Sequence, residues 1–242
     1  MLSIHAKPDL VERRRKGPVI FAVFSYRYDA HLVPGMLQNI SPMVDGWVAY
    51  DDRNSRDIFS DEPHRRQLLV SAARDAGADW ILAIDPDERF ERRLASAIRP
   101  MTAGNEYVAF SFPIRELYAP HAYRVDGIWG RKAQTRLLRV PPAIEKSPMF
   151  LHSPWHAISP GIEVRVAEFN IYHLKMITPE RRRARRDLYN HLDPKGTQQA
   201  IGYDYLADET GLELENIPVH KFYDPPYEED NGLWMPDMAA KD

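Results

Sequence analysis

The chain contains no cysteine, which excludes disulfide bonds, cysteine-ligated zinc sites and thiol nucleophiles. It also has no long apolar stretch, because the longest runs, residues 19–24 and 80–84, are far too short to cross a bilayer. The apolar core of a signal peptide is missing at the N-terminus, where the basic residues 13–16 lead directly into the first apolar run. The sequence has no internal repeat and no low-complexity segment. We therefore expect a soluble protein located in the cytoplasm.

Neither sign of charge dominates the chain, since 32 Lys and Arg residues face 35 Asp and Glu residues for a formal net charge of −3. A chain with this balance is not a general polyanion binder, and we expect no nucleic-acid partner. A composition of 44% hydrophobic and 28% charged residues is ordinary for a globular protein and excludes global disorder. The length of 242 residues favours one domain with an appendage.

Apolar and amphipathic segments alternate over the first hundred residues. The apolar runs predict strands at 19–24, 46–50 and 80–84, with helices between them that begin near Pro34 and Asp61. This alternation predicts parallel strands joined by right-handed crossovers. Beyond residue 100 we expect further strands at 106–113, 135–140 and 165–173, followed by a helix that Thr178 caps and Pro179 begins.

Acidic side chains follow two of the predicted strands. Asp85-Pro86-Asp87-Glu88 follows the third strand, and residues 51–57 (DDRNSRD) follow the second. Ligands of open α/β sheets collect outside the carboxyl ends of the strands, so both segments are placed to bind one. Crowded carboxylates at that edge favour a hard cation such as Mg²⁺ or Mn²⁺. The alternative for each segment is a polar turn without a binding role.

These segments resemble the family-2 glycosyltransferases of the GT-A fold. The resemblance is carried by the first strand with Ser25, by DDRNSRD, by residues 80–88 and by residues 171–174 with Arg181 and Tyr189. DDRNSRD is similar to the family's D-D-x-S-x-D pattern with one extra residue before the serine, and residues 80–88 are similar to its D-x-D-E signature. The resemblance is closest over residues 18–92 and partial to about residue 193.

The resemblance implies an α/β fold with a single GT-A-type domain. Its central sheet would be mixed and mostly parallel, with helices on both sides and a Rossmann-like nucleotide-binding half. We expect an N-terminal arm at 1–17, the glycosyltransferase domain at 18–195 and a C-terminal extension at 196–242. Within the domain, residues 18–105 would bind the nucleotide sugar and residues 106–195 the acceptor.

The activity that the resemblance implies is metal-assisted, inverting transfer of a sugar from a nucleotide-diphosphate donor to a hydroxyl of a glycan or lipid-linked acceptor, in cell-surface glycan synthesis. The implied nucleotide contacts are Ser25, Asp51, Asp52, Arg65, Arg66 and Asp85. The implied ligands of Mn²⁺ or Mg²⁺ are Asp85, Asp87 and His173.

Two other functional classes stay open. One is a nucleotidyltransferase of the same topology, which residues 25–27 disfavour because they lack the glycines of a phosphate loop. The other is a non-catalytic module that binds a nucleotide or a sugar.

The catalytic base of an inverting transferase is a carboxylate near the acceptor hydroxyl. Glu116 is the first candidate and Asp126 the second, because Glu116 lies closer to the strand at 106–113. Tyr118 and Trp129 suit stacking on an acceptor sugar, although aromatic residues are more often part of a core. His156, together with His152, is expected in a loop on the acceptor side.

Five arginines fall within residues 181–186, on the predicted C-terminal helix. We expect them to form mainly a solvated helix face. Alternatively, Arg181 or Arg185 reaches the donor diphosphate, or the face contacts an anionic membrane as a peripheral partner. Arg131, Arg136 and Arg139 could contact an acidic or phosphorylated acceptor.

Overall fold

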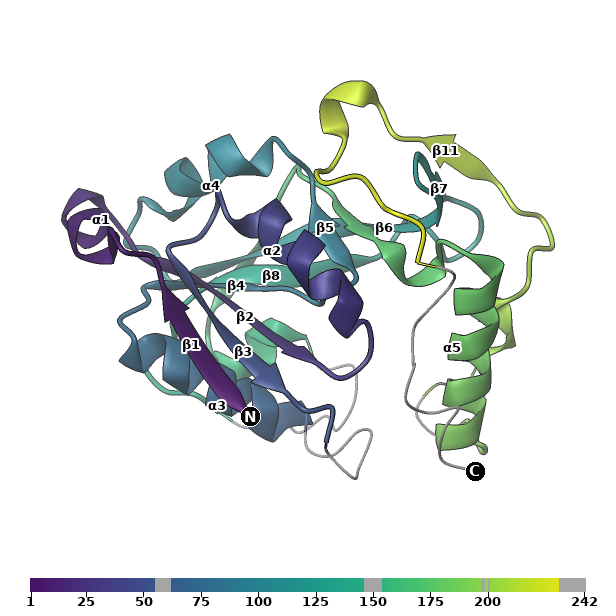
Figure 1. The fold of residues 1–242 in the computed structure, drawn as a ribbon, viewed down its shortest axis with the longest axis horizontal. Helices are drawn as coiled ribbons and strands as arrows, with labels where there is room; N and C mark the ends of the chain where they lie inside the picture. Colours follow the sequence, from purple (N-terminus) through teal and green to yellow (C-terminus); the bar gives the residue numbers. More distant parts are fainter. Residues whose placement is uncertain (55–61, 146–153, 197–198, 200, 231–242) are drawn as a thin grey trace.

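A mixed central sheet with helices on both faces organises the molecule (Figure 1). The computed structural model describes residues 1–54, 62–145, 154–196, 199 and 201–230. The main path of the sheet runs in the order β1-β3-β2-β4-β8-β6-β10-β5. The strands of this path are β1 (Leu2–Ala6), β2 (Ile20–Tyr26), β3 (Gly46–Asp51), β4 (Trp80–Ala83), β5 (Glu88–Phe90), β6 (Val108–Ala119), β8 (Ala133–Arg139) and β10 (Ile171–His173). The predicted α/β class with a mixed sheet is confirmed.

Three parallel strands form the first half of this sheet, because β2 pairs in parallel with both β3 and β4. Antiparallel strands extend it on either side, with β1 on β3 and β8 on β4. Three further strands lie off this path: β7 (Ala122–Arg124), β9 (Glu163–Val166) and β11 (Leu214–Asn216). Strands β7 and β9 pair with β6, and β11 pairs with β7.

The helices cover both faces of the sheet. They are α1 (Leu10–Lys16), α2 (Val33–Ile40), α3 (Glu62–Asp75), α4 (Leu94–Thr102) and α5 (Pro179–Leu192). Strand β2 is buried along its apolar part, as its continuous hydrophobic run predicts. Ile20, Ala22 and Phe24 join the core that contains residues of α2 and α4. Phe21 and Val23 face the opposite core, which contains residues of α3.

Two segments differ from the sequence-based expectation. The expected N-terminal arm, residues 1–17, contains regular structure, because β1 pairs with β3 at the sheet edge and α1 follows it. All side chains of β1 are exposed, so its pairing rests on the backbone and leaves no apolar pattern to detect. The strand expected at 165–173 is divided into β9 and β10. Between them Asn170 donates from its backbone and its side chain to Glu91.

The C-terminal part of the chain is packed onto the rest of the molecule. Helix α5 begins as predicted, with the hydroxyl of Thr178 accepting a hydrogen bond from the backbone of Arg181. After it, β11 pairs with β7, and Tyr223 is completely buried. Among the described residues, the helices are too short or too polar for any of them to span a membrane.

Candidate active site

A cavity of about 510 Å³ lies at the carboxyl ends of β2, β3 and β4. Helix α5 stands opposite the ends of β2 and β3 and supplies part of its lining (Figure 1). The cavity brings together eight of the residues expected from the sequence: Ser25, Asp52, Arg65, Arg66, Asp85, Asp87, Glu116 and His173. They come from segments up to 148 positions apart, so the fold gathers into one place what the sequence separates.

Strand pairing explains why these segments meet. The backbone of Asp52 donates to Tyr26 across the ends of β3 and β2, and that of Ile84 donates to Val23 across the ends of β4 and β2. The chain leaves the sheet directly after these bonds, so the side chains that follow enter the space beyond the strand ends. His173 is brought to the same space because β10 lies between β6 and β5.

Asp87, His173 and Glu116 form a row across the floor of the cavity. The Nε2 atom of His173 lies 3.3 Å from Oδ2 of Asp87, and its Nδ1 atom lies 3.0 Å from Oε2 of Glu116. All three side chains are nearly buried. Glu116 is also 3.7 Å from the ammonium group of Lys175.

The charges in this row determine its protonation. Burial disfavours the imidazolium form of His173, but the carboxylates of Glu116 and Asp87 outweigh burial and raise its pKa to about 9. Burial opposes ionisation of Glu116 as well, yet His173 and Lys175 hold its pKa at about 2. For Asp87, burial is again outweighed, by His173 and Arg185, and its pKa is well below the usual value. The row therefore contains two carboxylates with an imidazolium between them.

Arg136 holds the other two acids of the D-x-D-E segment. Its Nη2 atom donates to Asp85 at 2.7 Å and to Glu88 at 2.5 Å. Glu88 is completely buried, and its second oxygen accepts from the backbone of Asp85. These contacts fix the turn, and they direct the carboxylate of Asp85 toward Arg136.

The arginines of α5 correct the expectation of a solvated helix face. Arg181, Arg182 and Arg185 are buried, whereas Ala184 is exposed. Arg185 donates to Asp87 at 2.5 Å and to Asp29 at 3.0 Å, and Arg181 donates to Asp29 at 2.9 Å. A buried arginine needs such partners, and they lie 98 to 156 positions away, where no local pattern can reveal them.

A second group of ion pairs lines the side of the cavity formed by α3. Arg65 lies 3.0 Å from Asp52, and Arg66 pairs with Glu62 while its guanidinium lies over the ring of Trp155. Burial is the main reason that the pKa of Asp52 is raised. Asp51 does not line the cavity, and Arg53 binds both of its oxygens and lowers its pKa to about 2.

The remaining predicted residues lie outside the cavity lining. Asp126 is held by Arg124 and by the backbone of Glu213. Tyr118 and Trp129 are buried in one aromatic cluster, because they pack on Met176, Tyr203 and Leu206. His156 lies 2.8 Å from the hydroxyl of Thr135, while its neighbour Trp155 reaches the cavity. Ser55, Arg56, Asp57, Asp61 and His152 fall outside the described residues.

The cavity also contains residues that the sequence analysis did not single out. Lys132, Lys175, Tyr203, Tyr205 and Asp29 line it, and Gln134 and Gln199 are near them in the lining. Lys175 follows His173 by two positions, which is a local signal that could have identified it. Residues 203 and 205 lie in the expected C-terminal extension, in a segment (GYDY) whose paired tyrosines are the one visible hint.

Asp87 and His173 are the two residues of the cavity that could together offer ligands to a divalent cation. Asp87 and His173 present an oxygen and a nitrogen 3.3 Å apart, close to the separation of about 3 Å between neighbouring ligands of an octahedral ion with bonds of about 2.1 Å. Asp85, the third expected ligand, is bound by Arg136 instead. Across the described ranges, no three Asp, Glu or His side chains form a group that could hold a metal ion. Mg²⁺ commonly takes one or two carboxylates and completes its shell with phosphate and water, so two protein ligands are compatible with it.

Comparison with known proteins gives a weak structural likeness. No family model matches the chain, and no curated protein matches it. Solved structures similar to it include the crystal structure of a glycosyltransferase involved in the glycosylation of the major capsid of PBCV-1. The two sequences are 12% identical, the TM-score is 0.31, and the match covers 50% of this chain and 60% of that one. A TM-score of this size does not establish a shared fold.

Proposed function

We propose that the chain is a glycosyltransferase that moves a sugar from a nucleoside-diphosphate donor to a hydroxyl group of an acceptor. The observation that carries the proposal is the cavity at the carboxyl ends of β2, β3 and β4. There the row of Asp87, His173 and Glu116 lies between an arginine-rich side and an aromatic side. The first side suits a nucleoside diphosphate, and the second suits a saccharide.

The donor is assigned to the side formed by β2, β3 and α3. Arg27, Arg65 and Arg66 line this side, and their guanidinium groups are suited to phosphate oxygens. Ser25 and Asp52 offer a hydroxyl and a carboxylate to the nucleoside. The proposal uses Asp52 in place of Asp51, because Asp52 is the member of the pair that lines the cavity.

Asp87 and His173 would hold the divalent cation, Mn²⁺ or Mg²⁺. When bound, the cation supplies positive charge that stabilises the departing diphosphate. For His173 to act as a ligand it must first lose its proton, since a metal binds only the neutral imidazole. Arg185, which lies against Asp87, supplies a further positive charge at the same place.

Glu116 is the proposed base of an inverting reaction. The acceptor oxygen attacks the anomeric carbon, the bond from that carbon to the diphosphate oxygen breaks, and the hydroxyl proton passes to Glu116. In the absence of a bound cation, His173 and Lys175 keep this carboxylate ionised. When His173 is neutral and holds the cation, Lys175 remains the positive charge beside Glu116 and lowers its basicity, so we expect Glu116 to act on a proton that is already leaving in the transition state.

A thermal-shift panel of UDP-, GDP-, ADP- and dTDP-linked sugars, each with and without Mn²⁺, tests the donor assignment. A ligand that binds the folded state raises the melting temperature by mass action, and we expect one nucleotide to do so more strongly with Mn²⁺. Asp87→Asn should remove the part that depends on Mn²⁺. Asp187→Asn, the same change at an exposed position of α5, should keep it. The proposal fails if no nucleotide stabilises the parent protein.

Turnover measured with the donor identified in that panel tests the base. Glu116→Gln should lower kcat by about 100-fold or more, since a general base contributes about 10² to 10⁴. The affinity for the nucleotide should stay within about twofold. Glu180→Gln, at an exposed position, is the matched control. A larger loss with Asp126→Asn than with Glu116→Gln would move the base to Asp126.

A further inference from the structure

Another part of the cavity lining combines lysines with tyrosines. Lys132 directly precedes β8, and Lys175 lies in the short turn Leu174–Met176 that follows β10. Tyr189 comes from α5, and Tyr203 and Tyr205 come from the segment after it. We call these five residues the lysine–tyrosine wall. All five line the cavity.

This wall carries more positive than negative charge. Lys132 and Lys175 are close enough to repel, and the pKa of Lys132 is lowered first by burial and then by Lys175. Within the described part of the chain, Lys132 forms no ion pair. Its ammonium group lies instead 5.2 Å from the ring centre of Trp129 and 5.9 Å from that of Tyr205.

Two carboxylates among the described residues contact the wall: Asp193 accepts from the hydroxyl of Tyr203 at 3.2 Å, and Glu116 lies beside the lysines, where its charge is already shared. His173 lies 3.0 Å from one of its oxygens and Lys175 lies 3.7 Å from the other. Two lysines, Lys132 and Lys175, therefore share this carboxylate with His173, which also contacts Asp87. Positive charge held in a partly buried site without a counter-ion is unfavourable, so a second anion would be bound there with a gain in free energy.

The aromatic rings indicate which kind of molecule carries the anionic group. Tyr203 stacks on Tyr189, with ring centres 5.1 Å apart, so these two rings are held in place. Tyr205 packs beside Trp129 at 5.5 Å and also borders the cavity. Fixed tyrosine rings beside lysines provide a flat apolar surface, hydroxyl groups and positive charge together. A sugar ring that bears an acidic group presents the complementary features.

We propose that the lysine–tyrosine wall binds an acidic saccharide, with its carboxylate or phosphate on Lys132 and Lys175 and its ring against Tyr205. The inference rests on the proposed function, in which this saccharide is the acceptor. Lys175 contacts Glu116, so an anion held by Lys175 brings a hydroxyl of the same molecule to the proposed base. The acceptor class is then a uronate or a sugar phosphate rather than a neutral sugar.

Isothermal titration calorimetry on the full chain tests the inference with four probes: D-glucuronic acid, glucose 6-phosphate, methyl glucoside and inorganic phosphate. We expect at least one of the two acidic sugars to bind about tenfold more tightly than methyl glucoside. Tighter binding of glucuronic acid identifies a carboxylate acceptor, and tighter binding of glucose 6-phosphate identifies a phosphorylated one. Equal binding of methyl glucoside would overturn the inference. So would inorganic phosphate that binds as tightly as both acidic sugars, because the wall would then recognise the anion alone.

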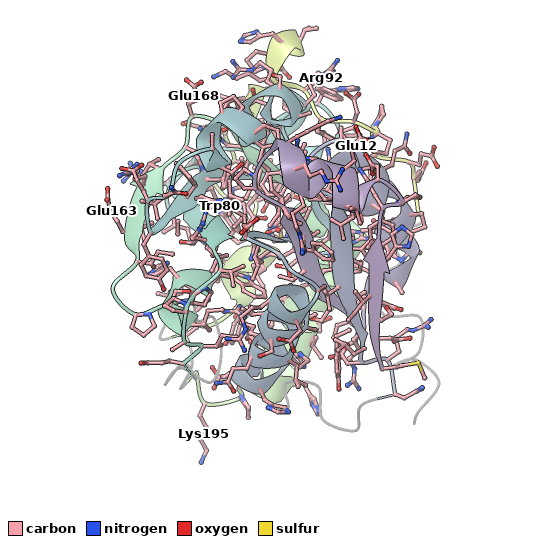
Figure 2. All side chains as sticks on the ribbon, turned by 90° about the vertical axis from the view of Figure 1, so that its left-hand side faces the viewer. Glu12, Trp80, Arg92, Glu163, Glu168 and Lys195 are labelled. Carbon is pink, nitrogen blue, oxygen red and sulfur yellow. The ribbon has the colours of Figure 1, made fainter. Side chains whose placement is uncertain are left out.

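Three lysine variants separate binding from folding. Lys132→Met should weaken the acidic sugar about tenfold, and Lys132→Arg should restore most of the loss because it keeps the charge. Lys195→Met is the matched control, since Lys195 is exposed and projects from the surface away from the body of the molecule (Figure 2). Unchanged affinity in Lys132→Met, with the fold intact by circular dichroism, would contradict the inference.

Nucleotide titration of the same samples distinguishes the two proposals. If the parent protein binds a nucleotide sugar but no acidic saccharide, the inference about the wall is wrong and the proposed function stands. If it binds the acidic saccharide but no nucleotide, the wall is assigned correctly and the glycosyltransferase function fails. Lys132→Met should leave nucleotide affinity within about twofold of the parent value, because the donor is assigned to the side formed by β2, β3 and α3.

Discussion

Each carboxylate that lines the cavity faces at least one cationic side chain of the protein. The pairs are Asp29 with Arg181 and Arg185, Asp52 with Arg65, Glu62 with Arg66, Asp85 and Glu88 with Arg136, Asp87 with Arg185 and His173, and Glu116 with His173 and Lys175. The diphosphate of the proposed donor would therefore compete with these carboxylates for their cations. Its binding energy is the difference between two sets of ion pairs, which is smaller than either set alone.

One ion pair at the edge of this network gives a pH-dependent prediction. Asp230 accepts from His31 at 2.7 Å and from Tyr227 at 2.6 Å, and it also pairs with Arg181. Burial works against its ionisation, but these donors lower its pKa from 3.8 to about 2. The folded pKa is below the unfolded one, so the stabilisation is complete above about pH 4 and is lost as the pH falls from 3.8 toward 2.

Asp230→Asn should accordingly lower the free energy of unfolding at pH 7 by about 2 kcal/mol, because hydrogen bonds to a charged group are worth about 1.5–3 kcal/mol. The difference from the parent protein should be nearly unchanged at pH 5 and should shrink when urea unfolding is repeated at pH 3. Asp187→Asn, whose carboxylate is exposed, should change stability by less than about 0.5 kcal/mol. A difference for Asp230→Asn that is equally large at pH 3 and pH 7 would show that its charge is not responsible.

At the scale of elements, sequence patterns predicted the strands, helices and caps that depend on residues close together in the sequence. The first strands and helices were predictable because burial on two faces of β2 and β4 produces continuous apolar runs. The start of α5 was predictable because its cap is three residues from its donor. The inward direction of Arg181 and Arg185 was not, because their partner Asp29 is distant in sequence and a run of arginines is typical of a solvated face.

The cap of α5 yields a prediction for this element. Thr178→Ala removes the hydroxyl that accepts from the backbone of Arg181, and the loss of an N-cap costs about 1 kcal/mol. The melting temperature should fall by about 2–4 °C in a chain of this size. Thr178→Ser retains the hydroxyl and should stay within a few tenths of a kcal/mol of the parent. If the alanine and serine variants melt together, the cap does not stabilise α5.

At the scale of the whole molecule, residues from the N-terminal and the C-terminal halves of the chain together line the cavity. The acidic half of the site could be predicted because Asp85 and Asp87 follow a recognisable strand. The lysine–tyrosine wall could not be predicted, because its five residues come from four separate segments. In the sequence its three tyrosines resemble ordinary core or surface residues. Tyr118 and Trp129 were predicted to contact the acceptor because they are aromatic. In the structure they do not line the cavity, and they pack behind the lysine–tyrosine wall.

The last described segment contacts the strand that carries His173. Tyr223 is completely buried, its ring lies 5.3 Å from that of Tyr172, and its hydroxyl donates to the backbone of Pro120. Tyr172 directly precedes His173 and donates to the backbone of Lys221. Residues 221–223 therefore pack against the strand that carries the central histidine of the cavity, and they belong to the same cooperative unit.

Tyr223→Ala should lower the free energy of unfolding by about 3–5 kcal/mol, as expected for a buried aromatic residue. Calorimetry should record one transition at a lower temperature, because a segment integrated into the core unfolds with the rest. Val219→Ala, four positions earlier in the same segment and 85% exposed, should change stability by no more than about 0.5 kcal/mol. A second transition at low temperature, with the main one unshifted, would mean that the segment detaches alone. In that case the position of His173 would not depend on it.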